Sequence, residues 1–292
     1  MKYSFITRHK NTYPISLQCQ VLGVSRSGYY NYQSSQASKP DDTKHQEMLE
    51  WIKDIAESSD NSYGSRRMKI ALNILGFPVS RNKARKLMRE AGVQVRHRKK
   101  YKVTTNSNHK QPVFDNLLGR QFDVPQPDQV YASDVTYIWT QEGWLYLAVV
   151  IDLCTRKVVG WSMSSRMKAQ LVCDALKMAI WQRRPKAGLI HHSDRGSQYA
   201  SRAFRQLLKA HGIKGSMSRK GDCWDNAVVE SFFGSLKQER VQWRSYQTRY
   251  EAQQDILQYI SMFYNSYRLH SYLGYTSPNE FEKQLMEMKK VA

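Results

Sequence analysis

The spacing of apolar residues divides the chain into a helical first third and a strand-rich later part. In the later part, β-prone apolar runs alternate with amphipathic stretches, and this pattern predicts strands over 129–139, 144–152, 157–163, 189–193 and 213–217. Helices are predicted over 168–183 and 201–211, and a last one begins near Asp225. Three antiparallel strands followed by alternating helices and strands predict an α/β fold, a mixed five-stranded sheet flanked by helices on both faces.

The first third contains two candidate helix-turn-helix segments. Residues 15–30 predict a short helix, a turn at Gly23 and a second helix capped by Ser25, which fits either a DNA-reading unit or two short core helices. An amphipathic helix over 41–58 precedes a stronger candidate: a helix over 63–75, a Gly/Pro stop and a basic helix capped by Ser80. A solvated basic helix on a small bundle is the alternative.

These changes of pattern predict five units. They are an N-terminal helix-turn-helix-like segment (1–38), a second helical helix-turn-helix DNA-binding domain (39–95), a basic linker (96–125), the α/β core (126–245) and a C-terminal helical extension (246–292). In the extension, one long helix is predicted over 246–270. Its Tyr/Arg-rich end either stacks on splayed bases or, as we favour, covers the sheet (Tyr264, Tyr267, Arg268).

The charge of the 292-residue chain indicates a polyanionic partner. Its formal net charge is +20 and its pI is near 9.8. Residues 61–110 hold fourteen Lys or Arg and a single acid, Glu90, so contact with double-stranded DNA is expected to begin there. The candidate DNA-binding residues of this stretch are Arg66, Arg67, Arg81, Lys83, Arg85, Lys86, Arg98, Lys99 and Lys100.

A membrane partner and a structural zinc site both fit the sequence poorly. No run of about 18 apolar residues occurs, which argues against a membrane partner. The four cysteines are scattered without a Cys-x-x-Cys pair, which favours a reducing cytosolic compartment and argues against a structural zinc site.

Three carboxylates fall where the predicted elements could bring them together. Asp134 lies within the first strand, Asp194 at the end of the fourth and Glu230 on the last helix. If the two strands are parallel neighbours, the aspartates lie side by side and repel each other unless cations neutralise them. Hard oxygen ligands select Mg²⁺ or Mn²⁺, and two such ions serve phosphoryl transfer. Taken singly, each acid is more often a turn, cap or solvated residue.

Two further residues lie on the helix that carries Glu230. Lys237 follows two turns later, about 10 Å along the axis, and is expected to contact a DNA phosphate. Asn226 lies one turn before Glu230 and either orients that carboxylate or the scissile phosphate, or occupies the first turn as a cap. Asp152 is interpreted as a strand-end turn residue.

The motifs around the three acids resemble those of a known family. They read Ser-Asp-Val-Thr-Tyr, His-Ser-Asp-Arg-Gly-Ser-Gln-Tyr and Asp-Asn-Ala-Val-Val-Glu-Ser-Phe-Phe-Gly-Ser-Leu-Lys, with 35 residues between Asp194 and Glu230. With these motifs the chain resembles the OrfB transposases of the IS-three family of bacterial insertion sequences, which share the ribonuclease-H-like core of retroviral integrases. The resemblance extends to the segment 63–92 and to the C-terminal Tyr-Leu-Gly-Tyr-Thr-Ser-Pro motif.

The resemblance implies a function. It implies a ribonuclease-H-like DDE catalytic core at 126–245 with Asp134, Asp194 and Glu230 as catalytic residues and ligands of two Mg²⁺ or Mn²⁺ ions. It further implies a transposase that binds terminal inverted repeats, frees a 3′-OH and transfers it, as a homo-oligomer on DNA. An OrfA partner, or a frameshift fusion to OrfA, is left open. A nuclease that only hydrolyses, or a DNA-binding regulator, are the alternatives.

Overall fold

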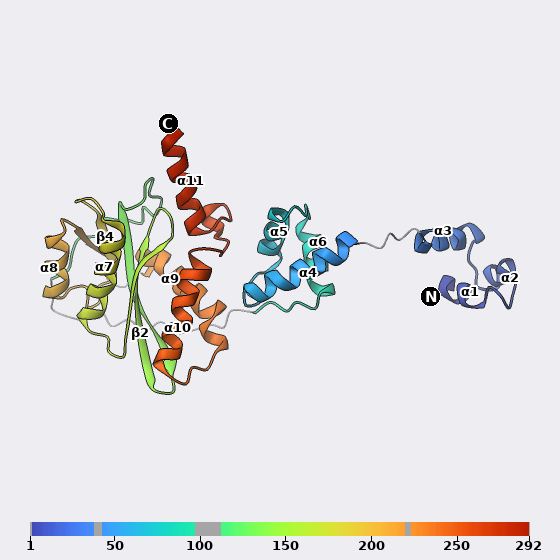
Figure 1. Cartoon of the computed structure of the whole chain (residues 1–292), viewed down its shortest axis with the longest axis horizontal. Coiled ribbons are helices and arrows are strands. Elements are labelled where there is room, and N and C mark those ends of the chain that lie inside the picture. Colours follow the sequence, from blue (N-terminus) through green and yellow to red (C-terminus); the bar gives the residue numbers. More distant parts are fainter. Residues whose placement is uncertain (1, 38–42, 97–111, 220–222, 292) are drawn as a thin grey trace.

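A mixed five-stranded sheet, in the order β3-β2-β1-β4-β5, forms the centre of the later part of the chain (Figure 1). This computed structural model describes residues 2–37, 43–96, 112–219 and 223–291. The strands are β1 (Val130–Thr140), β2 (Gly143–Asp152), β3 (Val158–Ser164), β4 (Ile190–Ser193) and β5 (Lys214–Met217). The predicted α/β class and mixed five-stranded sheet are therefore confirmed.

The register of the sheet places the acidic ends of two strands together. β1 pairs antiparallel with β2, and β2 with β3, whereas β1 pairs parallel with β4, and β4 with β5. In the β1–β4 pair, Ser133 lies opposite Ser193, so Asp134 and Asp194 follow at the same level. The expectation that these strands are parallel neighbours is confirmed. Beyond Ser133, β1 runs on without β4 beside it.

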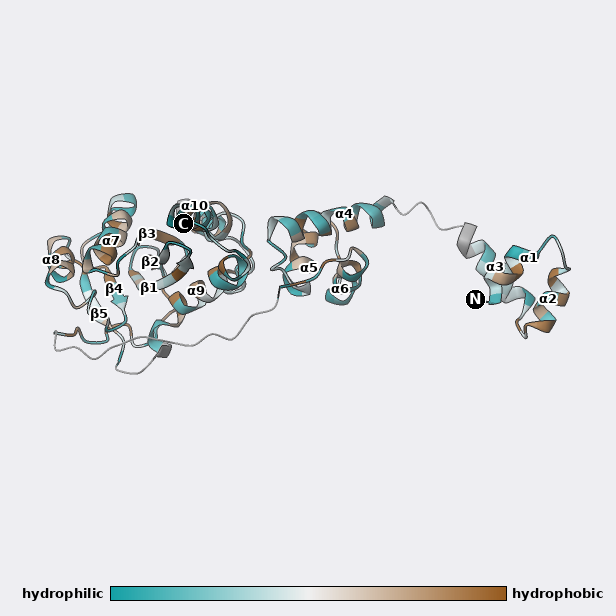
Figure 2. Ribbon diagram, turned by 90° about the horizontal axis from the view of Figure 1, so that it is seen from below, coloured by the Kyte–Doolittle hydropathy of each residue, from teal (hydrophilic) through white to brown (hydrophobic). Residues whose placement is uncertain are grey.

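Helices cover both faces of the sheet (Figures 1 and 2). On one face lie α7 (Ala169–Arg183) and α8 (Arg202–Ala210), and on the other α9 (Ala227–Glu239) and α10 (Arg249–Gln258). Each face is sealed by its own apolar cluster, with Leu176 and Phe204 in the first and Phe232 and Ile256 in the second. Gly160 of β3 allows close packing of α7, because a Cβ there would overlap the carbonyl oxygen of Ala175.

The first third is helical, as predicted. Its elements are α1 (Lys2–His9), α2 (Ile15–Val21), α3 (Arg26–Ala37), α4 (Thr43–Ser58), α5 (Ser65–Ile74) and α6 (Arg81–Glu90). Gly23 turns the chain between α2 and α3 with φ +61°, and the Ser80 hydroxyl accepts the Lys83 N–H at 3.1 Å to cap α6. The prediction missed α1, because only Ile6 of that helix is buried and its apolar periodicity is weak.

The single long helix predicted over 246–270 is shorter than expected at both ends and is not α-helical throughout. Tyr246 forms a β-bridge with Thr140, α10 begins only at Arg249, and a π-helical turn follows (Tyr259–Tyr264). The Thr248 hydroxyl accepts the Glu251 N–H at 3.0 Å and so fixes the start of α10. Tyr264 and Arg268 are buried, which excludes these two from stacking on bases.

The later part of the predicted linker 96–125 belongs with the core. Leu118 and Val124 are buried in the apolar cluster beneath α9. The backbone N–H of Leu117 donates to the Ser216 hydroxyl of β5 at 2.9 Å. Residues 97–111, which contain the basic run, lie outside the described residues.

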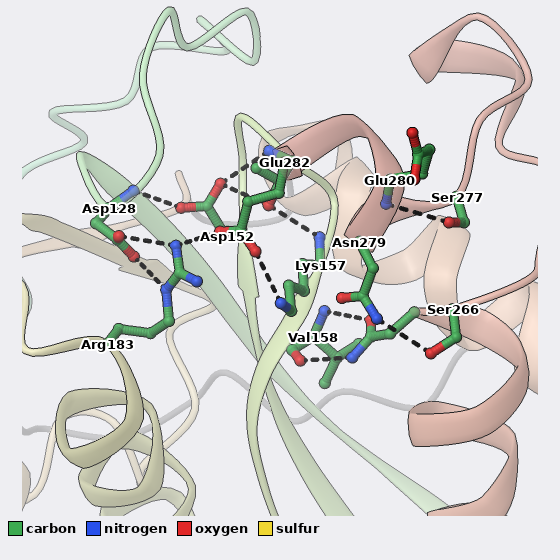
Figure 3. A network of polar contacts seen from close by, with 12 residues as sticks. Asp128, Asp152, Lys157, Val158, Arg183, Ser266, Ser277, Asn279, Glu280 and Glu282 are labelled. Carbon is green, nitrogen blue, oxygen red and sulfur yellow. Dashed lines mark hydrogen bonds and ion pairs between the residues drawn. The ribbon is translucent and has the colours of Figure 1, made fainter. Parts of the chain in front are cut away.

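A polar network attaches the C-terminal extension to the core (Figure 3). Glu282 of α11 (Pro278–Val291) pairs with Lys157 at 2.7 Å and with Arg183 at 2.5 Å, and Arg183 also pairs with Asp128. Asp152 accepts the Asp128 N–H and the Thr155 N–H, the role of a strand-end turn residue that we predicted. The extension is therefore a fixed part of the fold.

Candidate active site

Two neighbouring strands deliver two carboxylates to one end of the sheet. Asp134 follows the last β1 residue paired with β4, and Asp194 follows the last residue of β4. Burial raises the pKa of the Asp134 carboxyl well above its usual value, and the negative charges of Asp194 and Glu230 raise it further. The three acids are therefore close enough to repel one another.

Helix α9 presents the third carboxylate because its other face is apolar. Val229, Phe232 and Leu236 are buried against the sheet. Glu230 lies half-buried beside them, and burial raises its pKa. The predicted helix thus exists, although it starts at Ala227, after a 3₁₀ turn over Cys223–Asn226.

Lys237 supplies the positive charge nearest to these acids on α9. Its ammonium lies 5.1 Å from the centroid of the Tyr137 ring on β1. Burial lowers the Lys237 pKa, while the charge of Asp134 acts in the opposite direction. Lys237 therefore interacts electrostatically with the Asp134 carboxylate. It lies on the side of the site where β1 has no β4 neighbour.

Asn226 is a link between the helix and the strand. It is 4% exposed, and its Nδ2 donates to the Ser133 carbonyl at 3.2 Å. Its side chain makes no capping bond to α9. Asn226 therefore occupies the expected N-cap position of α9 without a capping bond from its side chain. Its burial disfavours a DNA contact, and its hydrogen bond holds the start of α9 against the residue before Asp134.

Asp225 is a site residue that the sequence reasoning missed. Its carboxylate is fully buried and accepts hydrogen bonds from Arg120 Nε at 2.8 Å, Asn116 Nδ2 at 2.9 Å and the Arg219 N–H at 2.9 Å. Burial alone would raise the pKa of Asp225, but the hydrogen bonds from Arg219 and Arg120 outweigh it and hold the pKa below its usual value. Arg120 lies 105 residues earlier in the chain, a distance at which no spacing rule reveals the pair.

The chemistry of the site suits hard divalent cations. Crowded carboxylates are oxygen donors of the kind that Mg²⁺ and Mn²⁺ prefer. Among the described residues, however, no three His, Cys, Asp or Glu side chains already stand at the spacing of a metal site. The carboxylates are chemically suited to these ions, but in the described part of the chain their oxygens do not stand at coordination distance from a common point.

The candidate DNA-binding residues divide into three groups. Arg66 and four residues of α6 are exposed (Arg81, Lys83, Arg85, Lys86). Arg67 is instead turned toward the core, 3.6 Å from Glu239 and over the Tyr63 ring, which disfavours the expected DNA contact. Arg98, Lys99 and Lys100 lie outside the described residues. Along the described chain, no helix is long and apolar enough to cross a membrane.

Comparison with known families defines the class of protein. Residues 124–223 and 230–286 match two family models, each described as an integrase core domain, and residues 44–101 match an HTH-like domain. These matches agree with the ribonuclease-H-like core and with the second helical unit, which directly precedes it. They place the chain among the polynucleotidyl transferases of the integrase and transposase type.

The curated relatives define the family. The chain is 44% identical over 270 residues to an uncharacterized 31 kDa protein of the insertion element IS600 from Shigella sonnei, covering 92% of this chain and 99% of the relative. It is 40% identical over 285 residues to transposase InsF of the insertion sequence IS3A from Escherichia coli (strain K12), covering 97% and 99%. The chain belongs to the transposases of the IS3 family of insertion sequences.

Similarity to solved structures is more distant. A chain of the simian T-cell lymphotropic virus intasome, in complex with the PP2A regulatory subunit B56 gamma, is 14% identical with a TM-score of 0.47, covering 73% of this chain and 70% of that one. The catalytic core domain of HTLV-2 integrase, in complex with magnesium, is 17% identical with a TM-score of 0.43, covering 54% and 98%.

Proposed function

We propose that this transposase cleaves DNA at the ends of its own insertion sequence and transfers the freed 3′-OH to another phosphodiester, with Asp134, Asp194 and Glu230 as catalytic residues. The observation that supports the proposal is the placement of Asp134 and Asp194 at the same level of two neighbouring strands, with Glu230 on α9 near enough for both acids to raise the pKa of Asp134, in a protein of charge +20. Repulsion between carboxylates destabilises a purely structural cluster, whereas bound cations offset it in a catalytic site.

The same carboxylates would hold Mg²⁺ or Mn²⁺, with two ions as our proposal. When bound, such ions supply charge stabilisation at the attacking and leaving oxygens of a phosphodiester. Lys237 would bind a phosphate of the reacting strand, because its ammonium lies on the open side of β1 near Asp134. Asn226 would act as a positioning residue, since its hydrogen bond to Ser133 ties α9 to β1.

We further propose that residues 1–38 and 39–95 bind the terminal inverted repeats as double-stranded DNA. The exposed cations of α6 and Arg66 support this role, because released counterions favour binding to a polyanion. Pairing of two ends would require a homo-oligomer on DNA. A transposition assay with and without the upstream reading frame would decide whether an OrfA product takes part.

A gel assay tests the catalytic proposal. Full-length protein, Mg²⁺ and a labelled, precleaved element end are expected to give joined product, whereas shortened strands alone would support the hydrolysis-only alternative. Asp134→Asn, Asp194→Asn and Glu230→Gln are each expected to abolish joining. Asp174→Asn, at an exposed carboxylate of α7, is the matched control. Triad variants that cleave and join as the control does would refute the assignment and favour a different active site.

A further inference from the structure

A cavity lies away from the three candidate catalytic carboxylates, at the junction of the α4–α6 unit and the C-terminal extension. Its volume is about 370 Å³, within the range of small-ligand sites. The α4–α6 unit and the extension both contribute to its wall, which is formed by Gly64, Ser65, Arg66, Arg67, Arg81, Ser271 and Tyr275. This described lining holds three guanidinium groups and three hydroxyls, and no carboxylate.

Positive charge is in excess around this cavity. Arg66 is exposed and makes no hydrogen bond or ion pair within the described chain, and Arg81 donates only to the Ser65 hydroxyl, at 3.4 Å. The one acid near Arg67 is Glu239, at 3.6 Å, and Arg268 already binds that carboxylate at 2.7 Å. One carboxylate is therefore shared between two arginines, while the other two arginines of the cavity have none.

The neighbouring His270 is affected by the positive charges around this cavity. Burial, together with the positive charges of Arg268, Arg156 and Arg67, lowers the pKa of its imidazole to about 3. The segment that follows this histidine supplies Ser271 and Tyr275 to the cavity wall, and an antiparallel bridge between His270 and Thr276 holds the segment closed. An anion in the cavity would relieve this repulsion.

We propose that the cavity binds a phosphate group of the DNA backbone, with Arg66 and Arg81 as its principal ligands and Ser271 as a hydroxyl donor from the extension. Guanidinium groups match phosphate oxygens in both charge and planar geometry. The proposal rests on the proposed function as a DNA-binding transposase and adds a particular phosphate site to it.

The position of the site gives it a consequence for catalysis. Arg67 lines the cavity and also contacts Glu239, the last residue of the helix that carries Glu230 and Lys237. A phosphate held between Arg66 and Ser271 would fasten the α4–α6 unit to the extension beside that contact. DNA bound by the helical unit would then also fix the end of α9.

The experiment measures binding of full-length protein to a fluorescent element-end duplex across a salt series, in EDTA so that no cleavage occurs. Each lost phosphate contact lowers the slope of log K against log salt by about 0.9. The double variant Arg66→Gln/Arg81→Gln is expected to show this drop. Each single variant should show a smaller drop, because the other arginine still binds the phosphate, and Ser271→Ala should lower affinity severalfold without changing the charge. Arg202→Gln, an exposed arginine of α8 that removes the same charge, is expected to leave the slope unchanged.

A second measurement separates DNA from free phosphate. Millimolar inorganic phosphate is expected to raise the unfolding temperature of the wild type more than that of Arg66→Gln. If phosphate stabilises the protein but the DNA slopes of the variants match Arg202→Gln, the site takes a free anion and the DNA proposal is overturned. Ser271→Ala that binds like wild type would overturn the role of the extension.

The two proposals fail separately. Wild-type protein that binds the duplex with the expected slopes but never cleaves it in Mg²⁺ would refute the catalytic proposal and leave the phosphate site standing. Protein that cleaves and joins DNA while Arg66→Gln and Arg81→Gln bind like Arg202→Gln would refute the phosphate site alone.

Discussion

The C-terminal end of α9 contains a buried ion pair whose loss should be costly. Glu239 and Arg268 have side chains only 4% and 5% exposed, and their closest atoms are 2.7 Å apart. Arg268 Nε also donates to Glu239, at 2.8 Å to Oε2, and the Tyr259 hydroxyl donates to the same carboxylate at 2.7 Å. Glu239→Gln keeps the shape of the side chain, removes its charge and leaves a buried guanidinium without a counterion.

The magnitude follows from the burial of both partners. Removing one partner of a buried pair costs about 3–5 kcal/mol, because the remaining charge is uncompensated. At roughly 2–4 °C per kcal/mol for a unit of this size, the unfolding temperature should fall by about 6–20 °C. The exposed pair Asp174–Lys177, with side chains 43% and 56% exposed, is the control, and Asp174→Asn should cost at most about 1 kcal/mol.

Thermal unfolding followed by tryptophan fluorescence, with guanidinium titrations beside it, measures both changes. The double variant Glu239→Met/Arg268→Met should recover part of the loss, because it removes the buried guanidinium that Glu239→Gln leaves uncompensated. Recovery is incomplete because Arg67, whose side chain is 23% exposed, and the Tyr259 hydroxyl still lose their partner. If Glu239→Gln costs no more than Asp174→Asn, or if the double variant is worse than the single one, the ion pair does not hold the end of α9 as argued.

Three further changes test other parts of the structure. Gly160→Ala should lower the free energy of unfolding by about 1–3 kcal/mol in guanidinium titrations, because the added methyl overlaps the Ala175 carbonyl and displaces α7. Asp225→Asn should lower the free energy of unfolding more at pH 7 than at pH 3, as urea titrations at the two pH values would measure. The folded pKa of Asp225 is lowered, so the stabilisation by its carboxylate is fully present above the unfolded pKa of about 4 and shrinks as the pH falls below that value. Asn226→Ala should lower kcat for cleavage while leaving the Kd for duplex DNA unchanged, because its partner is the Ser133 carbonyl; a raised Kd with normal kcat would make it a DNA contact.

The sequence predicted the sheet well because its strands carry a strong local signal. Each strand end differs from the predicted one by at most one residue, since apolar runs are bounded by turn signals such as Gln141-Glu142-Gly143. The sequence analysis placed Asp134 and Asp194 side by side on the condition that β1 and β4 are parallel neighbours, and the register shows that they are. The family motifs and the sheet register therefore lead to the same two residues, Asp134 and Asp194.

The sequence failed where a distant partner overrides a local pattern. The apolar residues Ile256 and Ile260 fit one helical stripe, but apolar spacing does not show that the bridge from Tyr246 to Thr140 delays the start of that helix. Asp225 looked like a helix start for the same reason, because its partners Arg120 and Asn116 are more than a hundred residues away in the chain. The spacing of apolar residues shows which face of a helix is buried. It does not show which distant residue will bind the end of that helix.

The two ends of α9 show what those remote partners contribute. Asp225, just before the helix, is held by Arg120 and Arg219, and Glu239, its last residue, is held by Arg268. Apolar packing alone lets a helix slide or rotate on a sheet with little change in buried area, whereas hydrogen-bonded ion pairs are directional. Because Glu230 lies between these two anchors, its position relative to Asp134 depends on residues that no local pattern around the catalytic helix would select.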